Sequence, residues 1–159
     1  MTARTSIGKA LVEHIKSELD GSKPDTYFTN IYNCVSLNTF KFEEIKEFPY
    51  IGVHIGSETF QYQPSRQQWI FLDLSILIYD RDAGDIQEQL EKLIADIKTI
   101  IDSEDDLEYT IIKPDGSTLD AKVTQKSLNS VSTDEGLLAP YGFAEVSVTF
   151  RYAPYKRMY

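Results

Sequence analysis

The residues of this chain that could carry chemistry are mainly carboxylates. Asp80, Asp82 and Asp85 lie in the segment Asp-Arg-Asp-Ala-Gly-Asp, and closely spaced carboxylates of this kind can converge on a hard cation such as Ca²⁺. The segment lacks the third alternate ligand and the distal bidentate glutamate of a calcium loop. Asp85 also stands where the N-cap of a helix is expected, with Glu88 completing a capping box. The pattern therefore favours helix capping over metal binding.

A second carboxylate pair is predicted on strands. Asp73 and Glu145 each lie among apolar neighbours, and they would suit acid–base or two-metal chemistry if their strands were adjacent. The alternative is that both side chains are solvated or paired across strands on a half-exposed sheet face. With Asp80, these residues define one functional hypothesis, a small cytoplasmic enzyme that depends on a metal ion.

The remaining reactive residue types are sparse. The histidines are His14, in a predicted helix, and His54, in a predicted strand, and neither has a nucleophile or carboxylate at a recognised motif spacing. Cys34 is most simply a small apolar residue, although a nucleophilic role is an alternative. We also find no glycine-rich phosphate loop. We therefore expect no catalytic, metal-binding or cofactor-binding residues and no cofactor.

Two other segments contain residues typical of protein contacts. Between Phe60 and Gln68 the chain is polar and interrupted by proline, which predicts a loop or a distorted hairpin longer than a tight turn. Large aromatic side chains and arginine are favoured in buried interfaces, so this segment is either an interface or a loop folded back on its own sheet. The candidate contact residues are Phe60, Tyr62, Arg66 and Trp69.

The second segment is the acidic loop Thr133–Tyr141. It carries two leucines in a stretch that has no core of its own to bury them, which indicates a surface element that another molecule completes. Its candidate contact residues are Asp134, Glu135, Leu137, Leu138 and Tyr141. The tail 152–159 is basic and aromatic, and it is either a further contact segment or flexible.

Composition limits the possible functions. The chain has 159 residues, which suits a single domain over residues 1–159, and its formal net charge is −9. That charge has the wrong sign for a protein that holds nucleic acid by neutralising phosphates. No apolar run approaches the roughly 20 residues that cross a bilayer, and the first residues do not resemble a signal peptide. One cysteine permits no internal disulfide, so we expect a protein of a reducing cytoplasm with no membrane partner.

Hydrophobic periodicity predicts the elements that position these residues. Ser6 is the expected N-cap of a helix Ile7–Leu19, and an amphipathic helix covers Asp85–Ile101. Irregular strands are expected within Thr26–Phe48, and alternating apolar residues predict strands at Tyr50–Thr59 and Phe143–Tyr152. Gln68–Tyr79 is apolar on one face and half-apolar on the other, as in a central strand. A hairpin is expected over Tyr109–Thr124, turning at Lys113–Gly116. We predict an α+β fold with a mixed, mostly antiparallel twisted sheet and both helices on one face.

The order of these elements resembles the tail terminator proteins of long-tailed, siphovirus-type bacteriophages. The segments that carry the resemblance are Phe48–Gly56, Phe71–Tyr79 ending in Ile-Tyr-Asp, Asn129–Gly136 and Tyr141–Val146. The similarity spans most of the chain and consists of the order of the elements and of short sequence segments.

The resemblance implies a structural protein of the virion that is not an enzyme. Members of that family form a six-membered ring that caps the tail tube, stops its polymerisation and provides the docking surface for the head. The implied partners are further copies of the chain, the tail tube protein and a head connector or head-completion protein, with DNA only as cargo passing through the ring. The acidic balance suits such a channel. Besides the metal-dependent enzyme, the alternatives are a neck or head-completion protein of the same particle and an interaction module without a viral role.

Overall fold

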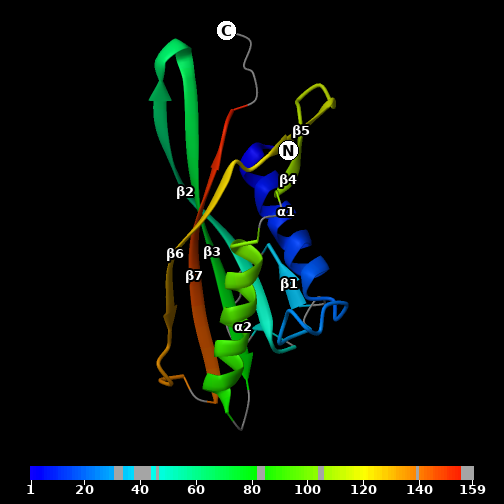
Figure 1. Cartoon of the computed structure of the whole chain (residues 1–159), viewed down its shortest axis with the longest axis vertical. Helices are drawn as coiled ribbons and strands as arrows, with labels where there is room; N and C mark the ends of the chain where they lie inside the picture. The colour runs from blue at the N-terminus through cyan, green and yellow to red at the C-terminus, as the bar shows by residue number, and fades with distance from the viewer. Residues whose placement is uncertain are drawn as a thin grey trace.

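The computed structural model describes residues 1–30, 34–37, 44–45, 47–81, 85–103, 106–138 and 140–154, except for the side chain of Arg66. Within these ranges two α-helices lie against one face of a five-stranded, mostly antiparallel sheet (Figure 1), which confirms the predicted α+β class. The strand order is β1-β2-β3-β7-β6, and β4 pairs with β5 in a separate two-stranded sheet. The elements are α1 (Ala3–Glu18), β1 (Val35–Ser36), β2 (Tyr50–Gln63), η3 (Pro64–Arg66), β3 (Gln67–Arg81), α2 (Ile86–Ile101), β4 (Glu108–Ile112), β5 (Thr118–Lys122), β6 (Gln125–Thr133) and β7 (Tyr141–Tyr152).

Helix α2 follows its predicted pattern. Asp85 is the N-cap, and its Oδ1 accepts a hydrogen bond from the Glu88 amide at 3.1 Å, which satisfies one of the free donors of the first turn. The helix packs on β3 and β7, and at Gly142 it comes so close that a Cβ would lie 2.7 Å from Ile86 Cγ1. Its predicted apolar stripe is buried throughout: Ile86, Leu90, Leu93, Ile94, Ile97, Ile100 and Ile101.

The predicted central strand is β3, which lies between β2 and β7. Its even-numbered aliphatic residues face the helices and are buried, while Trp69, Phe71 and Leu77 on the opposite face are only partly buried. On β7 the set predicted for the core face, Ala144, Val146, Val148, Phe150 and Tyr152, is also buried. The alternation of side chains along a strand is therefore visible in the sequence because only one face of this sheet is fully covered.

The segment between Phe60 and Gln68 was expected as a loop or a distorted hairpin, and it is a hairpin. Strands β2 and β3 remain paired from Glu58↔Leu72 to Gln63↔Gln67, and the turn is confined to η3, where Ser65 has φ 67°. A bulge between Ile55 and Glu58 interrupts the pairing. There Gly56 allows close approach, because a Cβ would lie 2.8 Å from the Asp73 carbonyl oxygen. The hairpin projects beyond the sheet, since the last pair of β3 with β7 is Ile70↔Tyr152 (Figure 1).

Helix α1 begins earlier than expected. Thr2, and not Ser6, is the N-cap, with its Oγ1 accepting from the Thr5 amide at 3.4 Å. Ser6 lies inside the helix, where its hydroxyl donates back to the Thr2 carbonyl at 2.8 Å. The predicted apolar positions Ile7, Leu11, Ile15 and Leu19 are all buried. Within the described part of 26–48, the expected irregular strands reduce to the short β1, parallel to β2.

The hairpin β4–β5 packs on α1 and turns at Lys113–Gly116, as predicted. Gly116 has φ +85° and its amide donates to the Lys113 carbonyl at 2.9 Å. Neither helix of the described ranges is long and apolar enough to span a membrane.

Candidate interaction surfaces

The projecting β2–β3 hairpin exposes large aromatic side chains. Phe60 is 52% exposed and Tyr62 is 77% exposed. The register places them on the helix-bearing side of the sheet, because Phe60 pairs with the buried core residue Ile70 and Tyr62 lies two residues further along β2. A rigid hairpin that carries two such rings away from the core is a suitable contact element.

The four residues predicted as one contact cluster are divided between two faces. Trp69 points to the opposite side of the hairpin from Phe60, since neighbouring positions on a strand alternate. Its ring is covered by Arg151, whose Cζ lies 4.2 Å from the ring centroid. The side chain of Arg66 lies outside the described residues. The hairpin therefore presents Phe60 and Tyr62 together, whereas Trp69 packs within its own sheet.

The loop between β6 and β7 has a polar interior. Asp134 accepts from the Leu138 amide through Oδ2 at 3.0 Å and from the Phe143 amide through Oδ1 at 3.4 Å. Its carbonyl oxygen accepts from the Leu137 amide at 3.0 Å, and its amide donates to the Phe143 carbonyl at 3.0 Å. Glu135 and Gly136 have positive φ, 54° and 83°. The carboxylate of Asp134 thus holds the turn in one shape.

That shape turns the leucines outward. Leu137 is 85% exposed, the largest value among the large apolar side chains of the described ranges, and Leu138 is 42% exposed. Because the loop folds around Asp134, no apolar interior remains for them. Tyr141 behaves differently, since its ring lies 5.9 Å from Phe48 and 5.6 Å from Arg81 Cζ. Of the predicted contact residues in this loop, Glu135, Leu137 and Leu138 are exposed, while Asp134 and Tyr141 support the turn.

An apolar pocket of about 430 Å³ lies at the base of the projecting hairpin. Three segments far apart in the sequence build it: the start of α1, the β2–β3 hairpin and the turn after β4, with the end of β7 between them. Its floor contains the buried side chains of Ile70, Ile111 and Tyr152. Its rim carries Phe60 and Ile112, which is 42% exposed. A pocket of this size and composition can accept an apolar side chain of another molecule.

A polar group lies at one side of this pocket. The Tyr152 hydroxyl donates to Glu58 Oε1 at 2.6 Å, and Arg4 Nε lies 3.7 Å from the same oxygen. The Arg4 guanidinium also donates to the Gly56 carbonyl. Burial, together with the adjacent Glu58 carboxylate, raises the pKa of Tyr152. Glu58 is therefore paired with Arg4 within its own chain, and the other cations among the lining residues are Lys113 and the Met1 ammonium group.

The carboxylates proposed for catalysis do not converge. Strands β3 and β7 are adjacent, as the hypothesis required, but Asp73 faces Thr149 and Glu145 faces Leu77. Four residues along a strand separate them by roughly 13 Å. The Asp73 carboxylate accepts from the Thr149 hydroxyl at 2.8 Å, which is the cross-strand pairing given as the alternative. Asp80 is buried on the helix-bearing side of β3, away from both.

The carboxylates of the calcium-like segment that the structure describes, Asp80 and Asp85, form local hydrogen bonds. Asp80 accepts from the Arg81 amide at 2.7 Å and Asp85 caps α2, whereas Asp82 lies outside the described residues. Within the described part of the chain, no three His, Cys, Asp or Glu side chains are placed to hold a metal ion.

Cys34 and the histidines show no catalytic arrangement. Partial burial, then the neighbouring Glu47 carboxylate, raises the pKa of the Cys34 thiol, which disfavours the nucleophilic thiolate. His54 is exposed on β2 opposite Ser75, and His14 lies on α1.

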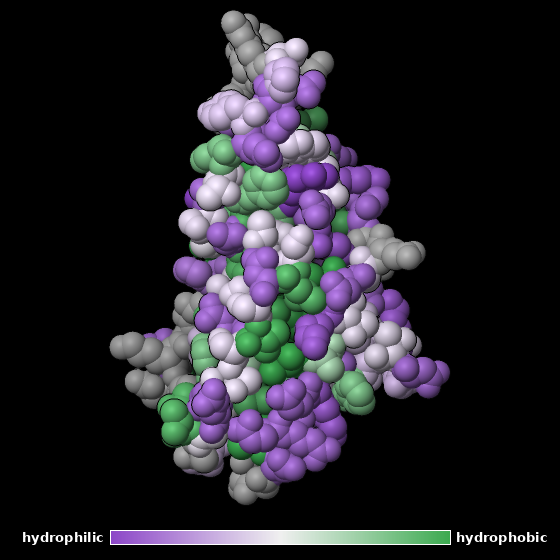
Figure 2. All heavy atoms as spheres, turned by 60° about the vertical axis from the view of Figure 1, so that its left-hand side comes forward, coloured by the Kyte–Doolittle hydropathy of each residue, from purple (hydrophilic) through white to green (hydrophobic). Residues whose placement is uncertain are grey.

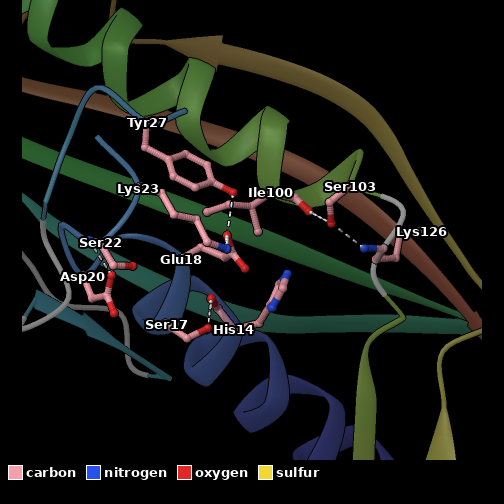
Figure 3. A network of polar contacts seen from close by, with 10 residues as sticks. All are labelled: His14, Ser17, Glu18, Asp20, Ser22, Lys23, Tyr27, Ile100, Ser103 and Lys126. Carbon is pink, nitrogen blue, oxygen red and sulfur yellow. Dashed lines mark hydrogen bonds and ion pairs between the residues drawn. The ribbon is translucent and has the colours of Figure 1, made fainter. Parts of the chain in front are cut away.

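A polar network ties the end of α1 to the segment that follows it (Figure 3). Glu18 Oε2 accepts from Lys23 Nζ at 2.6 Å and from the Tyr27 hydroxyl at 2.9 Å. Burial opposes ionisation of Glu18, but these two hydrogen bonds together with the charges of Lys23 and His14 outweigh it and hold the pKa of Glu18 below the usual value. On the other side of the same view, Lys126 donates to Ser103 at 3.3 Å. Glu18 and Lys23 are therefore paired within the chain.

Sequence reasoning missed the pocket and part of the exposed apolar surface. Figure 2 brings forward the side that carries β6 and shows apolar side chains in a band down its middle, with hydrophilic side chains around it. Val131 on the edge strand β6 is 42% exposed. The pocket residues Arg4, Ile111 and Ile112 had no local signal, because each was explained by its own helix or hairpin and only the tertiary fold brings them together.

Two comparisons with known proteins agree on one family, and a third shows a similar fold. The family model described as "Bacteriophage Tail Tube Terminator Protein" matches residues 1–159. The tail tube terminator protein p142 of Escherichia phage T5 is 61% identical over 157 residues, which cover 99% of this chain and 98% of that protein. A chain in the solved virion of a native gene transfer agent particle has a similar fold, with a TM-score of 0.51 and 11% identity over 94% of this chain and 98% of that chain.

Proposed function

Because the chain belongs to the bacteriophage tail tube terminator protein family, we propose that it caps the head-proximal end of a tail tube as a ring of identical subunits. The chain is a structural protein of the virion and is located in the tail. In the proposed ring, six copies end the growth of the tube and offer a docking surface to the head connector or a head-completion protein.

The exposure of large apolar side chains on two ordered projections carries the proposal of a ring. Tyr62 and Leu137 are 77% and 85% exposed, and both are held by hydrogen-bonded backbone. A closed ring with rotational symmetry needs two different, complementary patches on each subunit. The hairpin β2–β3 and the loop after β6 lie at opposite ends of the molecule (Figure 1), as heterologous contacts between neighbours require.

The charge of the chain supports passage of DNA through the ring. There are 25 acidic side chains against 16 lysines and arginines, so a channel lined by this protein repels phosphates and does not retain the genome. We propose DNA only as cargo in transit.

We further propose that the protein performs no reaction and needs no cofactor. The separation of Asp73 from Glu145 along the sheet and the raised pKa of the Cys34 thiol support this proposal.

Native mass spectrometry with negative-stain imaging tests the ring directly. The full chain is measured alone and after mixing with purified tail tubes, and we expect six-fold rings on one end of each tube. A chain that stays monomeric at high concentration and leaves tube ends bare contradicts the proposal. Binding to connector-bearing heads but never to tubes would instead identify a neck or head-completion protein.

A further inference from the structure

We propose that the loop Asp134–Leu138 of one subunit inserts Leu137 into the apolar pocket of the next subunit, and that this contact closes the ring. The inference rests on the proposed ring and names the two patches that form it. Hereafter the loop is Asp134–Leu138, and the end pocket is the 430 Å³ pocket lined by residues including Arg4, Phe60, Ile70, Ile111, Ile112, Lys113 and Tyr152.

The loop is already in a binding conformation. The Leu137 and Leu138 amides donate to Asp134 and the Glu135 amide donates to the Thr133 hydroxyl, while the Leu137 side chain is 85% exposed. A segment that is ordered before binding loses little conformational entropy on association. An ordered turn that holds a leucine in water has no benefit for the isolated chain, since the side chain contributes nothing to its core.

The end pocket offers the complementary shape. Ile70, Ile111 and Tyr152 line the pocket with buried side chains, and the exposed Phe60 and Ile112 extend its apolar surface outward. An apolar side chain that fills an apolar pocket bordered by polar residues is the usual arrangement of a hot spot.

Charge favours this pairing over other arrangements of two copies. Two chains of net charge −9 repel one another in general, so a specific contact benefits from a local match. The loop carries Glu135, and residues 133–141 contain no lysine or arginine. The residues that line the pocket carry three cations, Arg4, Lys113 and the Met1 ammonium group, against one carboxylate, Glu58. The nearby Asp115 carboxylate is turned to its own hairpin, where it accepts from the Ser117 amide and hydroxyl at 2.9 and 2.6 Å.

The loop cannot fill the pocket of its own chain. It lies between β6 and β7 near the lower end of the molecule in Figure 1, whereas the N-terminus and β4, whose residues line the pocket, lie in the upper half. The occupant is therefore a second copy, and the two patches do not overlap, so each subunit can give its loop to one neighbour and receive a loop from the other.

Two single substitutions test the pairing. Leu137→Asp removes the knob and leaves the pocket intact, whereas Ile112→Asp damages the pocket and leaves the loop intact. Both positions are exposed, so we expect the variants to unfold at the urea concentration of the wild type. We expect each variant alone to be monomeric, or to need at least about a tenfold higher concentration for half assembly, as a loss of about 1.4 kcal/mol per contact gives.

The mixture of the two variants is the decisive measurement. In an equimolar mixture, the intact loop of the Ile112→Asp chain can still enter the intact pocket of the Leu137→Asp chain. This is the one contact that remains, so native mass spectrometry should show heterodimers and no larger rings. Phe28→Asp, at a 69% exposed apolar position elsewhere, is the matched control and should assemble like the wild type. Leu137→Ser and Ile112→Ser replace the first pair if either aspartate variant fails to fold.

The outcomes separate this inference from the proposed function. Rings formed normally by Leu137→Asp, or a mixture without heterodimers, overturn the loop-in-pocket contact and leave the ring itself standing. Leu137→Asp rings that form but no longer bind tubes also overturn it, because the loop would then belong to the tube contact. If the wild-type protein forms no ring, either free or on tubes, both the loop-in-pocket contact and the proposed ring function are wrong.

Discussion

Replacing Asp96 with alanine should loosen the segment that connects α1 to the sheet. Asp96 lies on α2 with 1% of its surface exposed. Its Oδ1 accepts from the Phe28 amide at 2.9 Å, and its Oδ2 accepts from the Thr29 amide at 2.9 Å and the Thr29 hydroxyl at 2.5 Å. A buried carboxylate that receives three donors from a distant segment anchors that segment to the helix.

The expected magnitude follows from the donors that lose their acceptor. Each buried donor left without a partner costs about 1–3 kcal/mol. Phe28 and Thr29 are partly accessible, so their amides regain some hydration once released. We therefore expect Asp96→Ala to lower the free energy of unfolding by about 2–4 kcal/mol, which for a chain of this size lowers Tm by roughly 5–15 °C. Asp96→Asn keeps one acceptor oxygen and should lose about half as much.

Urea unfolding followed by far-UV circular dichroism measures the change, and amide hydrogen exchange locates it. We expect faster exchange at Phe28 and Thr29 in Asp96→Ala, while Glu91→Ala, at an exposed position of the same helix, should stay within about 0.5 kcal/mol of the wild type. If Asp96→Ala unfolds like Glu91→Ala and the two amides exchange at wild-type rates, the carboxylate does not anchor this segment and the reasoning is wrong.

Three further predictions concern packing, pH and binding. Gly142→Ala should lower the free energy of unfolding by about 1–3 kcal/mol, because its Cβ would lie 2.7 Å from Ile86 Cγ1 and Leu90 Cδ1; an unchanged urea midpoint would show that α2 can shift away at no cost. Burial raises the pKa of Tyr109 from 10.0 to about 12. The contribution of the neutral Tyr109 side chain to the free energy of unfolding is therefore complete below pH 10 and is lost as the pH rises towards 12. Urea midpoints of the wild type should fall over that range, and those of Tyr109→Phe should fall less steeply; equal slopes in the two proteins would contradict this. Tyr62→Ser should leave the urea midpoint unchanged but raise the concentration needed for half assembly of the proposed ring by about tenfold or more in native mass spectrometry, and unchanged assembly would remove the hairpin tip from the contact between subunits.

Much of the fold was predictable because it depends on local periodicity. The stripe of α2 and the alternation of β7 each follow from one continuous segment, and burial of one face keeps the pattern clear. The predicted start of α1 was wrong because Thr2 and Ser6 are both suitable N-cap residues. The sequence does not show that the Ser6 hydroxyl donates back to the Thr2 carbonyl. The hairpin was uncertain because Pro64 and the glutamines around it are typical of loops, whereas pairing across the hairpin extends both strands.

The contact surfaces were only partly predictable. The leucines of the loop were noticeable because apolar residues in an acidic turn are unusual. The division of Phe60 from Trp69 depends on the strand register set by the turn Pro64–Arg66, which pairs Phe60 with Ile70 and Gln61 with Trp69, and the sequence did not show where that turn lies. The end pocket was not predictable, since its walls come from positions as distant as Arg4, Ile70 and Tyr152.

The turn built around Asp134 separates the residue that holds its shape from the residues that it displays. Asp134 contacts only the backbone of its own chain in the hydrogen bonds described above, while Leu137 touches no core. Mutation can therefore exchange the displayed side chains without remodelling the turn. In the proposed ring, the residues that one subunit presents to the next can therefore diverge while the architecture beneath them stays constant.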